Sequence, residues 1–396
     1  MDFSSILFWL LVLLGHSALS CVLFNMVHAS AAPKISPVLT RKISEKMIFA
    51  FAVIPLVYFA ILGIQYGLMF HSELLPVWLK FYTTVAASMG GYFVLRWIYR
   101  AITRTLPKGA ELVVSTKQDV QSLVEESLYS GSKGRVFAAM PFNQSTQLSV
   151  DQWEFSFSQL PARLHGFRIC QISDLHLTGV IKQEYFEHVV DTVKQLDPDL
   201  VLITGDIVDE SKCLDWIGQT LSRLSARRGV YYVLGNHDLL VSDQQDLRRR
   251  LNDAGLIMAS NSQWHRIEVG DANLMLAGNE LPWYRGAEKL PPLDPGIPNS
   301  FSVLLSHSPD QIGWAVARNF DLMFAGHTHG GQVRLPIVGP IIAPSRYGIK
   351  YAAGTFQARR TLMHVSRGLS GDEPIRINCP PELGIFTLKR ETAYRD

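Results

Sequence analysis

The strongest constraint on the fold is a regular series of short apolar runs in the second half of the chain. From about residue 151, β-branched or aliphatic runs such as FRICQI, LVLIT and VYYVL recur, and amphipathic segments such as QEYFEHVVDTVKQL separate several of them. Apolar strands that alternate with amphipathic helices predict an α/β domain whose helices cover the sheet. The last stretch, from VRLPIVG to LGIFTLKR, reads as turns and strands and predicts an additional antiparallel portion.

Polar side chains that can bind metals directly follow five of these apolar runs. In open α/β sheets, sites form beyond the carboxyl ends of the strands, where the loops converge. Each motif alone also fits a turn or a cap, because Asn, Asp and Gly are common there. Five independent turns would not concentrate such side chains at strand ends, so together the motifs predict one site. Its candidate residues are Asp174, His176, Asp206, Asp209, Asn236, His237, Asp238, His307, His327 and His329.

The candidate ligands are carboxylates, an amide and imidazoles, with no cysteine among them. This mixture is typical of sites for Mn²⁺, Fe, Zn²⁺ or Ni²⁺ rather than of a structural thiolate zinc site. The set is too large for one ion and fits two ions, about 3.5–4 Å apart, that share one carboxylate. Such a pair suits phosphate-ester hydrolysis, in which a nearby acid, commonly a histidine, gives the leaving group its proton.

The motifs D-x-H, G-D-x-x-D, G-N-H-D, a lone His and G-H-x-H occur in this order. At these residues, across roughly 165–390, the chain resembles the calcineurin-like metallophosphoesterase superfamily. The resemblance implies two β-sheets packed together, with helices on their outer faces, and it assigns roles by position. One metal would be held by Asp174, His176 and His329, and the other by Asn236, His307 and His327, with Asp206 bridging the two. His237 would be the acid or phosphate-contacting residue, and Asp209 would be its orienting partner. Asp238 receives no role.

Several longer stretches resemble one branch of this superfamily. GHTHGGQVRLPIVGP, SHSPD, VSRGL and NCPPELGIFTL are similar to the YaeI and YkuE branch, which includes the chlamydial-type UDP-2,3-diacylglucosamine pyrophosphatase. The resemblance implies phosphodiester or pyrophosphate substrates, some of them lipids. The glycines of GGQ fit either a close backbone approach to the site or a tight turn. Arg346 and Arg367 are further candidates for phosphate contacts.

The first hundred residues contain three stretches that are apolar enough and long enough to cross a bilayer, which takes about 20 residues. They are Ile6–Phe24, Met47–Phe70 and roughly Trp78–Tyr99. We therefore predict a membrane domain with three transmembrane helices over 1–100, a connector over 101–150 and a metallophosphoesterase domain over 151–396. Within the connector, DVQSLVEESL has the spacing of an amphipathic helix.

Basic residues predict how these spans are oriented. The first connection carries Lys34, Arg41, Lys42 and Lys46, the second carries essentially none, and Arg100, Arg104 and Lys108 follow the third span. This pattern predicts a multi-pass protein, in a bacterial inner membrane, whose C-terminal domain is cytoplasmic. Four cysteines without a paired spacing agree with a reducing compartment.

The combined prediction is a membrane-anchored dinuclear-metal phosphoesterase with Mn²⁺ as the favoured metal. A lipid-linked substrate such as UDP-2,3-diacylglucosamine is favoured, because tethering concentrates the enzyme on substrates in the bilayer. A nucleic-acid partner is not expected, since Lys+Arg 37 nearly balances Asp+Glu 35. Two alternatives stay open: a phosphodiesterase for a soluble nucleotide-type substrate, and a membrane sensor or scaffold that keeps its metals without turnover.

Overall fold

The computed structural model describes residues 7–20, 46, 53, 57, 77–103, 106–260, 262–336 and 338–391. The chain forms two compact units, Met1–Thr105 and Leu106–Asp396. The predicted span Met47–Phe70 lies outside the described residues apart from two positions. The other two predicted spans coincide largely with described helices.

Two described helices of the first unit pack closely through glycines. One covers residues 7–20, and the other is α3 (Val77–Thr103). A Cβ on Gly15 would lie 1.7 Å from the Ala86 carbonyl oxygen, and one on Gly90 would lie 2.2 Å from that of Leu11. Only glycine therefore permits this approach of the two backbones. Within the part of the chain that the structure describes, no helix combines the length and the apolar character needed to cross a membrane.

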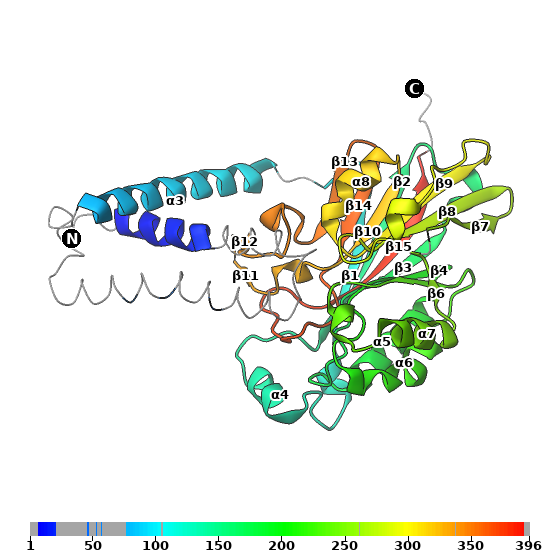
Figure 1. The fold of residues 1–396 in the computed structure, drawn as a ribbon, viewed down its shortest axis with the longest axis horizontal. Coiled ribbons are helices and arrows are strands. Elements are labelled where there is room, and N and C mark those ends of the chain that lie inside the picture. The colour runs from blue at the N-terminus through cyan, green and yellow to red at the C-terminus, as the bar shows by residue number, and fades with distance from the viewer. Residues whose placement is uncertain are drawn as a thin grey trace. The chain divides into compact units, whose positions relative to one another are not determined.

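The second unit is built on two mixed β-sheets (Figure 1). The seven-stranded sheet has the order β1 (Ala110–Asp119), β2 (Gln147–Phe157), β15 (Glu382–Arg390), β3 (Arg168–Ile172), β4 (Leu200–Thr204), β5 (Val230–Val233), β6 (Ile257–Met258). The six-stranded sheet has the order β13 (Gly354–Ala358), β14 (Thr361–Val365), β10 (Leu322–Ala325), β9 (Ser300–Ser306), β8 (Ala272–Asn279), β7 (His265–Val269). Strands β3 to β6 are parallel, as are β8, β9, β10 and β14. Parallel strands bring their carboxyl ends to a common edge in each sheet.

Side chains alternate along the central strands between two apolar layers, as the period of two in a strand requires. In β4, Leu200 and Leu202 enter the core between the sheets, whereas Val201 and Ile203 enter the core under the helices. The helices of the second unit are α4 (Gly131–Ala138), α5 (Gln183–Leu196), α6 (Asp215–Gln219), α7 (Gln244–Asp253) and α8 (Ile312–Ala317). The buried side chains of α5, α6 and α7 belong to the same core as Val201, while those of α8 pack against the six-stranded sheet. The predicted two-sheet α/β architecture is confirmed.

Residues 106–150 of the segment predicted as a connector, 101–150, belong to this second unit. Strand β1 pairs with β2 in antiparallel fashion from Ala110 opposite Phe155 to Asp119 opposite Gln147, with one shift of register between Leu112 and Val114. The amphipathic helix expected over DVQSLVEESL is wrong, since only a short 3-10 turn, Val120–Leu123, forms there. A buried Val120 ends the strand by packing into the core, and this tertiary contact outweighs the local helical spacing.

Candidate metal centre

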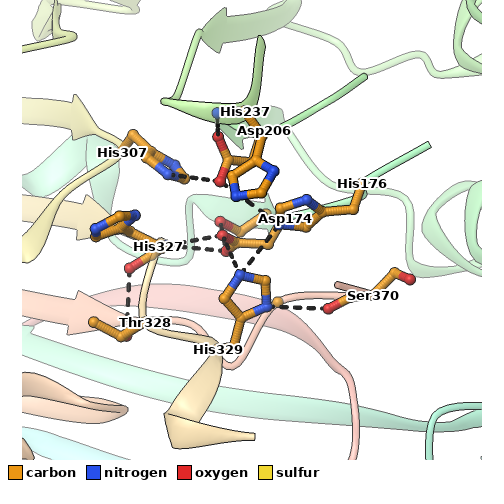
Figure 2. Close-up of polar contacts among 12 residues, drawn as sticks. Asp174, His176, Asp206, His237, His307, His327, Thr328, His329 and Ser370 are labelled. Carbon is orange, nitrogen blue, oxygen red and sulfur yellow. Dashed lines mark hydrogen bonds and ion pairs between the residues drawn. The ribbon is translucent and has the colours of Figure 1, made fainter. Parts of the chain in front are cut away.

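The five sequence motifs converge at the carboxyl ends of five strands. Asp174 and His176 follow β3, Asp206 follows β4, and Asn236 follows β5, all in the seven-stranded sheet. His307 follows β9, and His327 and His329 follow β10, so the six-stranded sheet supplies the remaining side chains. Figure 2 shows the imidazoles arranged around Asp174 and Asp206. The site thus lies where the edges of both sheets meet.

One group of possible metal ligands consists of Asp174, His176, Asp206 and His329, whose ligand atoms all lie within 4.8 Å of one another. The Nε2 atoms of His176 and His329 are 3.1 Å apart. Asp206 Oδ2 lies 3.6 Å from His176 Nε2, and Asp174 Oδ1 lies 3.6 Å from His329 Nε2. These side chains are buried except for His329, whose side chain is 12% exposed.

A second group consists of Asp206, His307 and His327. His307 Nε2 lies 3.0 Å from Asp206 Oδ2 and 3.2 Å from Asn236 Oδ1. The ring of His327 packs edge to face on that of His307, with 4.9 Å between centroids, and Trp283 covers both imidazoles at 5.0–5.3 Å. Asp206 belongs to both groups, so its carboxylate stands between them.

The hydrogen bonds of the imidazoles fix which ring nitrogen faces the centre. Nδ1 of His307 lies 2.7 Å from the Thr204 carbonyl oxygen, and Nδ1 of His329 lies 3.1 Å from that of Ser370. A carbonyl only accepts, so each Nδ1 carries a proton, and in the neutral ring of each histidine it is Nε2 that presents a lone pair to the centre. His176 is held in the same way, because its Nδ1 lies 3.0 Å from both carboxylate oxygens of Asp209.

This donor set fits bound divalent cations. The Nε2 atoms of His176 and His329 face each other at 3.1 Å, each with a lone pair in the neutral ring, and buried Asp206 Oδ2 has no hydrogen-bond partner. Burying unpaired acceptors so close together is costly unless a positive charge lies among them. Burial, together with the positive charge of Arg376, lowers the pKa of His329 well below its usual value, which keeps this imidazole neutral and able to bind a metal. The buried Asp and His groups are typical of a dimetal site.

Asp209 connects a buried ligand candidate, His176, to His237, a partly exposed histidine of the centre. Its Oδ2 lies 2.9 Å from Nδ1 of His237, in addition to its contact with His176. Burial disfavours the charged form of His237, but Asp206 and Asp209 outweigh this and raise its pKa to about 9. The His237 side chain is 23% exposed, so its Nε2 edge is the one that a substrate can reach.

Asp238, which received no role from the sequence, joins two of the metal-binding turns. Its buried carboxylate accepts hydrogen bonds from the backbone N–H groups of Ile207 and Val208, at 2.9 and 3.0 Å, and from Gly235 at 2.7 Å. It therefore fixes the turn that carries Asp206 against the turn that carries Asn236. The motif G-N-H-D contained this residue, but only the fold reveals that its partners lie on the neighbouring turn.

Several turns of the centre have unusual backbone conformations. Asp174, His176, Asp206, His327 and His329 all have positive φ, between 45° and 71°. Non-glycine residues rarely adopt this region, and such strain is concentrated at functional sites. Gly326 is required for a different reason, since an added Cβ would lie 1.9 Å from Ser173 Oγ and 2.4 Å from Asp174 Oδ2.

The remaining sequence candidates have structural partners. Gly330 and Gly331 form a tight turn at φ 65° and 82°, packed against Cys379 and Pro340, which favours the turn interpretation of GGQ. Arg367 pairs with buried Asp151 at 2.9 Å, and Arg346 donates to the Asp310 carbonyl at 2.6 Å. The sequence did not single out fully buried Arg376, which donates to the His329 carbonyl oxygen at 3.0 Å and holds the metal-binding turn in place.

Comparison with known proteins agrees with this geometry. Residues 167–331 match the calcineurin-like phosphoesterase family, and this match covers all five motifs. The metallophosphoesterase YkuE of Bacillus subtilis is 33% identical over 243 residues, which cover 59% of this chain and 82% of the relative. The chain belongs to the calcineurin-like metallophosphoesterases. It is a metal-dependent phosphoesterase of the hydrolase class.

Two further relatives differ in what their names state. The UDP-2,3-diacylglucosamine pyrophosphatase LpxG of Chlamydia muridarum is 25% identical over 282 residues, covering 57% of this chain and 84% of the relative. A Danio rerio protein named as a transmembrane protein with a metallophosphoesterase domain is 25% identical over 364 residues, covering 85% of this chain and 80% of the relative. YkuE and LpxG both belong to the branch that the sequence motifs indicated.

Proposed function

We propose that this chain is a membrane-anchored dinuclear phosphoesterase that hydrolyses a phosphodiester or pyrophosphate bond of a lipid-linked substrate. The observation that carries the proposal is the position of Asp206, shared by two buried ligand groups, with His237 at their exposed edge. Two neighbouring ions require a shared carboxylate, and a partly exposed imidazole beside them could give a leaving group the proton it needs.

Asp174, His176 and His329 would hold one ion, and Asn236, His307 and His327 the other, with Asp206 bridging. When bound, the two ions would supply Lewis-acid stabilisation of the phosphoryl oxygens and activation of water. Mn²⁺ is the metal we favour, because the set mixes oxygen and imidazole ligands and contains no thiolate.

His237 would donate the proton to the departing oxygen from Nε2, while Asp209 holds its Nδ1. The same carboxylate keeps His176 in the tautomer that presents Nε2 to the centre. One buried group thereby orients both a metal ligand and the acid. A sensor or scaffold without turnover would have no use for an oriented acid at its open edge, so this arrangement favours catalysis.

Two observations support a substrate in the bilayer. The similarity to the chlamydial pyrophosphatase points to UDP-2,3-diacylglucosamine as the first compound to test. Residues 151–396 make up about 62% of the chain, so the Danio rerio match over 85% must also include N-terminal residues. Together with the three apolar stretches, this supports an N-terminal membrane anchor, and the basic residues beside them favour a cytoplasmic catalytic domain.

The test uses the full chain, purified in detergent and loaded with Mn²⁺. It is incubated with UDP-2,3-diacylglucosamine, and the products are followed by mass spectrometry beside bis(p-nitrophenyl) phosphate as a soluble diester. We expect release of UMP and the lipid monophosphate, abolished by a chelator. His237→Ala should lower kcat by about 10²-fold or more with metal retained, while His188→Ala, a matched histidine on α5, should have no effect.

The other outcomes distinguish the alternatives. Cleavage of the soluble diester alone would support a phosphodiesterase with a different substrate and contradict the lipid assignment. Full metal occupancy without cleavage of either compound would favour the sensor or scaffold.

A further inference from the structure

An apolar hairpin with exposed side chains extends from the metal-binding turn. It contains β11 (Arg334–Leu335) and β12 (Gly339–Pro340), which pair with each other and with neither large sheet. Leu335, Val338, Ile341 and Ile342 are 37–45% exposed, although each is a large aliphatic residue. We call these four side chains the hairpin patch. In Figure 1 the two short strands lie outside the two-sheet sandwich.

Both ends of this segment are fixed to the metal-binding turn. On the outgoing side, Gly331 packs directly on the hairpin, because a Cβ there would lie 2.6 Å from Pro340 Cβ. On the returning side, Thr328, which stands between two ligand candidates, donates its hydroxyl to the Ala352 carbonyl oxygen at 2.7 Å. The hairpin patch is therefore at the rim of the catalytic centre.

The charge of the segment has one sign. Residues 333–351 contain Arg334, Arg346 and Lys350 and no acidic residue. Outside this segment, the Asp310 carboxylate accepts the Arg346 backbone N–H at 2.9 Å. Exposed aliphatic side chains beside cations are typical of surfaces that bind anionic lipid. A patch that bound a protein chain of ordinary composition would not require this charge bias.

A second patch of exposed apolar side chains lies at and after α4. Val136, Met140 and Phe142 are exposed at and after α4, Phe142 to 84%. Residues 131–142 contain two cations and no acid, and one of these cations, Lys133, pairs with Asp372 of a neighbouring loop at 3.9 Å. We call these three side chains the α4 patch. Lys133 donates to the Asp372 carbonyl oxygen, and Asn143 donates to that of Pro374.

The loop 372–378 joins the two patches. Its first residues contact the α4 segment, and its last residues contact the hairpin, because Arg334 N–H donates to the Ile377 carbonyl oxygen at 2.9 Å. Arg376, between them, holds the His329 turn. Both patches therefore border the segment that supports the metal centre.

We propose that the hairpin patch and the α4 patch together form a docking surface for an anionic lipid bilayer at the rim of the catalytic centre. This inference rests on the proposed function and deepens it. A bilayer seated on the rim would present a headgroup phosphate to the metals while its acyl chains stay in apolar surroundings. Bound in this way, a lipid substrate need not leave the membrane to be cleaved.

The first test measures contact with lipid and does not depend on activity. Ile341→Cys in the full chain is labelled with an environment-sensitive fluorophore and reconstituted into nanodiscs of anionic lipid with quenchers on the acyl chains. Ile257→Cys is the matched control, since Ile257 is similarly exposed, at 39%, on the edge strand β6. Cys170, Cys213 and Cys379 are buried, and unsubstituted protein treated with the label gives the background.

We expect a blue shift and quenching at position 341 in anionic nanodiscs, a weaker effect in neutral ones, and none at position 257. Equal quenching at both positions, or none at either, would overturn the proposal. A blue shift at position 341 without quenching by the labelled acyl chains would also overturn the proposal. It would indicate that a second copy of the chain covers the patch.

The second test separates docking from catalysis. Ile341→Asp should lower kcat/KM for UDP-2,3-diacylglucosamine in vesicles by about tenfold, the factor for about 1.4 kcal/mol, and leave kcat/KM for the soluble diester unchanged. Ile257→Asp should change neither value. Equal losses on both substrates, or no loss on either, would contradict the docking role. If the wild-type chain cleaves no lipid substrate, the proposed function fails, and the fluorescence result still decides whether the patch binds lipid.

Discussion

Replacing Asp209 with asparagine tests whether one buried carboxylate orients two histidines. Asp209 accepts the Nδ1–H of His176 at 3.0 Å and that of His237 at 2.9 Å. The side chain of asparagine has the same shape, but only one of its two terminal atoms accepts. Its amide group would point N–H donors at the second imidazole, which must then change its tautomer or turn away.

The magnitude follows from the loss of one charge-assisted hydrogen bond, worth about 1.5–3 kcal/mol. Since every 1.4 kcal/mol corresponds to a factor of about ten, we expect kcat/KM to fall by about 10–100-fold. If His176 loses its partner, its Nε2 gains a proton and the affinity for metal falls. If His237 loses its partner, metal is retained and kcat falls at saturating Mn²⁺.

The assay measures kcat/KM for bis(p-nitrophenyl) phosphate and metal content by mass spectrometry, across a Mn²⁺ titration. Asp321→Asn is the matched control, because Asp321 is equally buried and holds Ser302 through two hydrogen bonds, yet it precedes β10 at the end remote from the ligands. A variant Asp209→Asn whose kcat/KM and metal content both stay within about twofold of wild type would refute the orienting role.

Three more perturbations have defined outcomes. Asp238→Ala leaves three buried backbone N–H groups without acceptors, at a cost of about 1–3 kcal/mol each. The melting temperature measured by scanning fluorimetry should therefore fall by several degrees, and activity should fall with it. Unchanged stability would mean that water replaces the carboxylate. Gly326→Ala places a methyl group on Asp174 and should reduce metal content while the protein stays folded; full occupancy would contradict the predicted clash. Arg367 and His364 help to lower the pKa of buried Glu382 to about 2, against the penalty of burial, so its stabilising effect is complete above pH 4.5 and is lost as the pH falls toward 2. Between these limits wild type should lose up to about 3 kcal/mol more than Glu382→Gln in denaturant unfolding, and parallel pH profiles would exclude this contribution.

The site residues could be predicted in large part because each follows an apolar run directly. In a parallel sheet, this position alone brings a residue to the carboxyl edge, so Asp174, Asp206 and His327 could be grouped before their distances were known. Asp238 could not be assigned, since two of its three partners are the backbone amides of Ile207 and Val208 on another turn. Arg376 could not be found either, because a buried arginine that binds carbonyl oxygens leaves no pattern in the sequence.

The alternation of strands and helices, the order of the motifs and the types of ligand could all be predicted from the sequence. These depend on local periodicity and on chemistry that each residue carries wherever it lies. Local spacing could not show that β1 pairs with β2, or that a short 3-10 turn replaces the helix expected directly after β1, because strand pairing and the burial of Val120 are non-local contacts that outweigh helical spacing. The tertiary structure also decided which nitrogen of each histidine faces the centre, because carbonyl oxygens and a carboxylate from distant segments hold the other nitrogen.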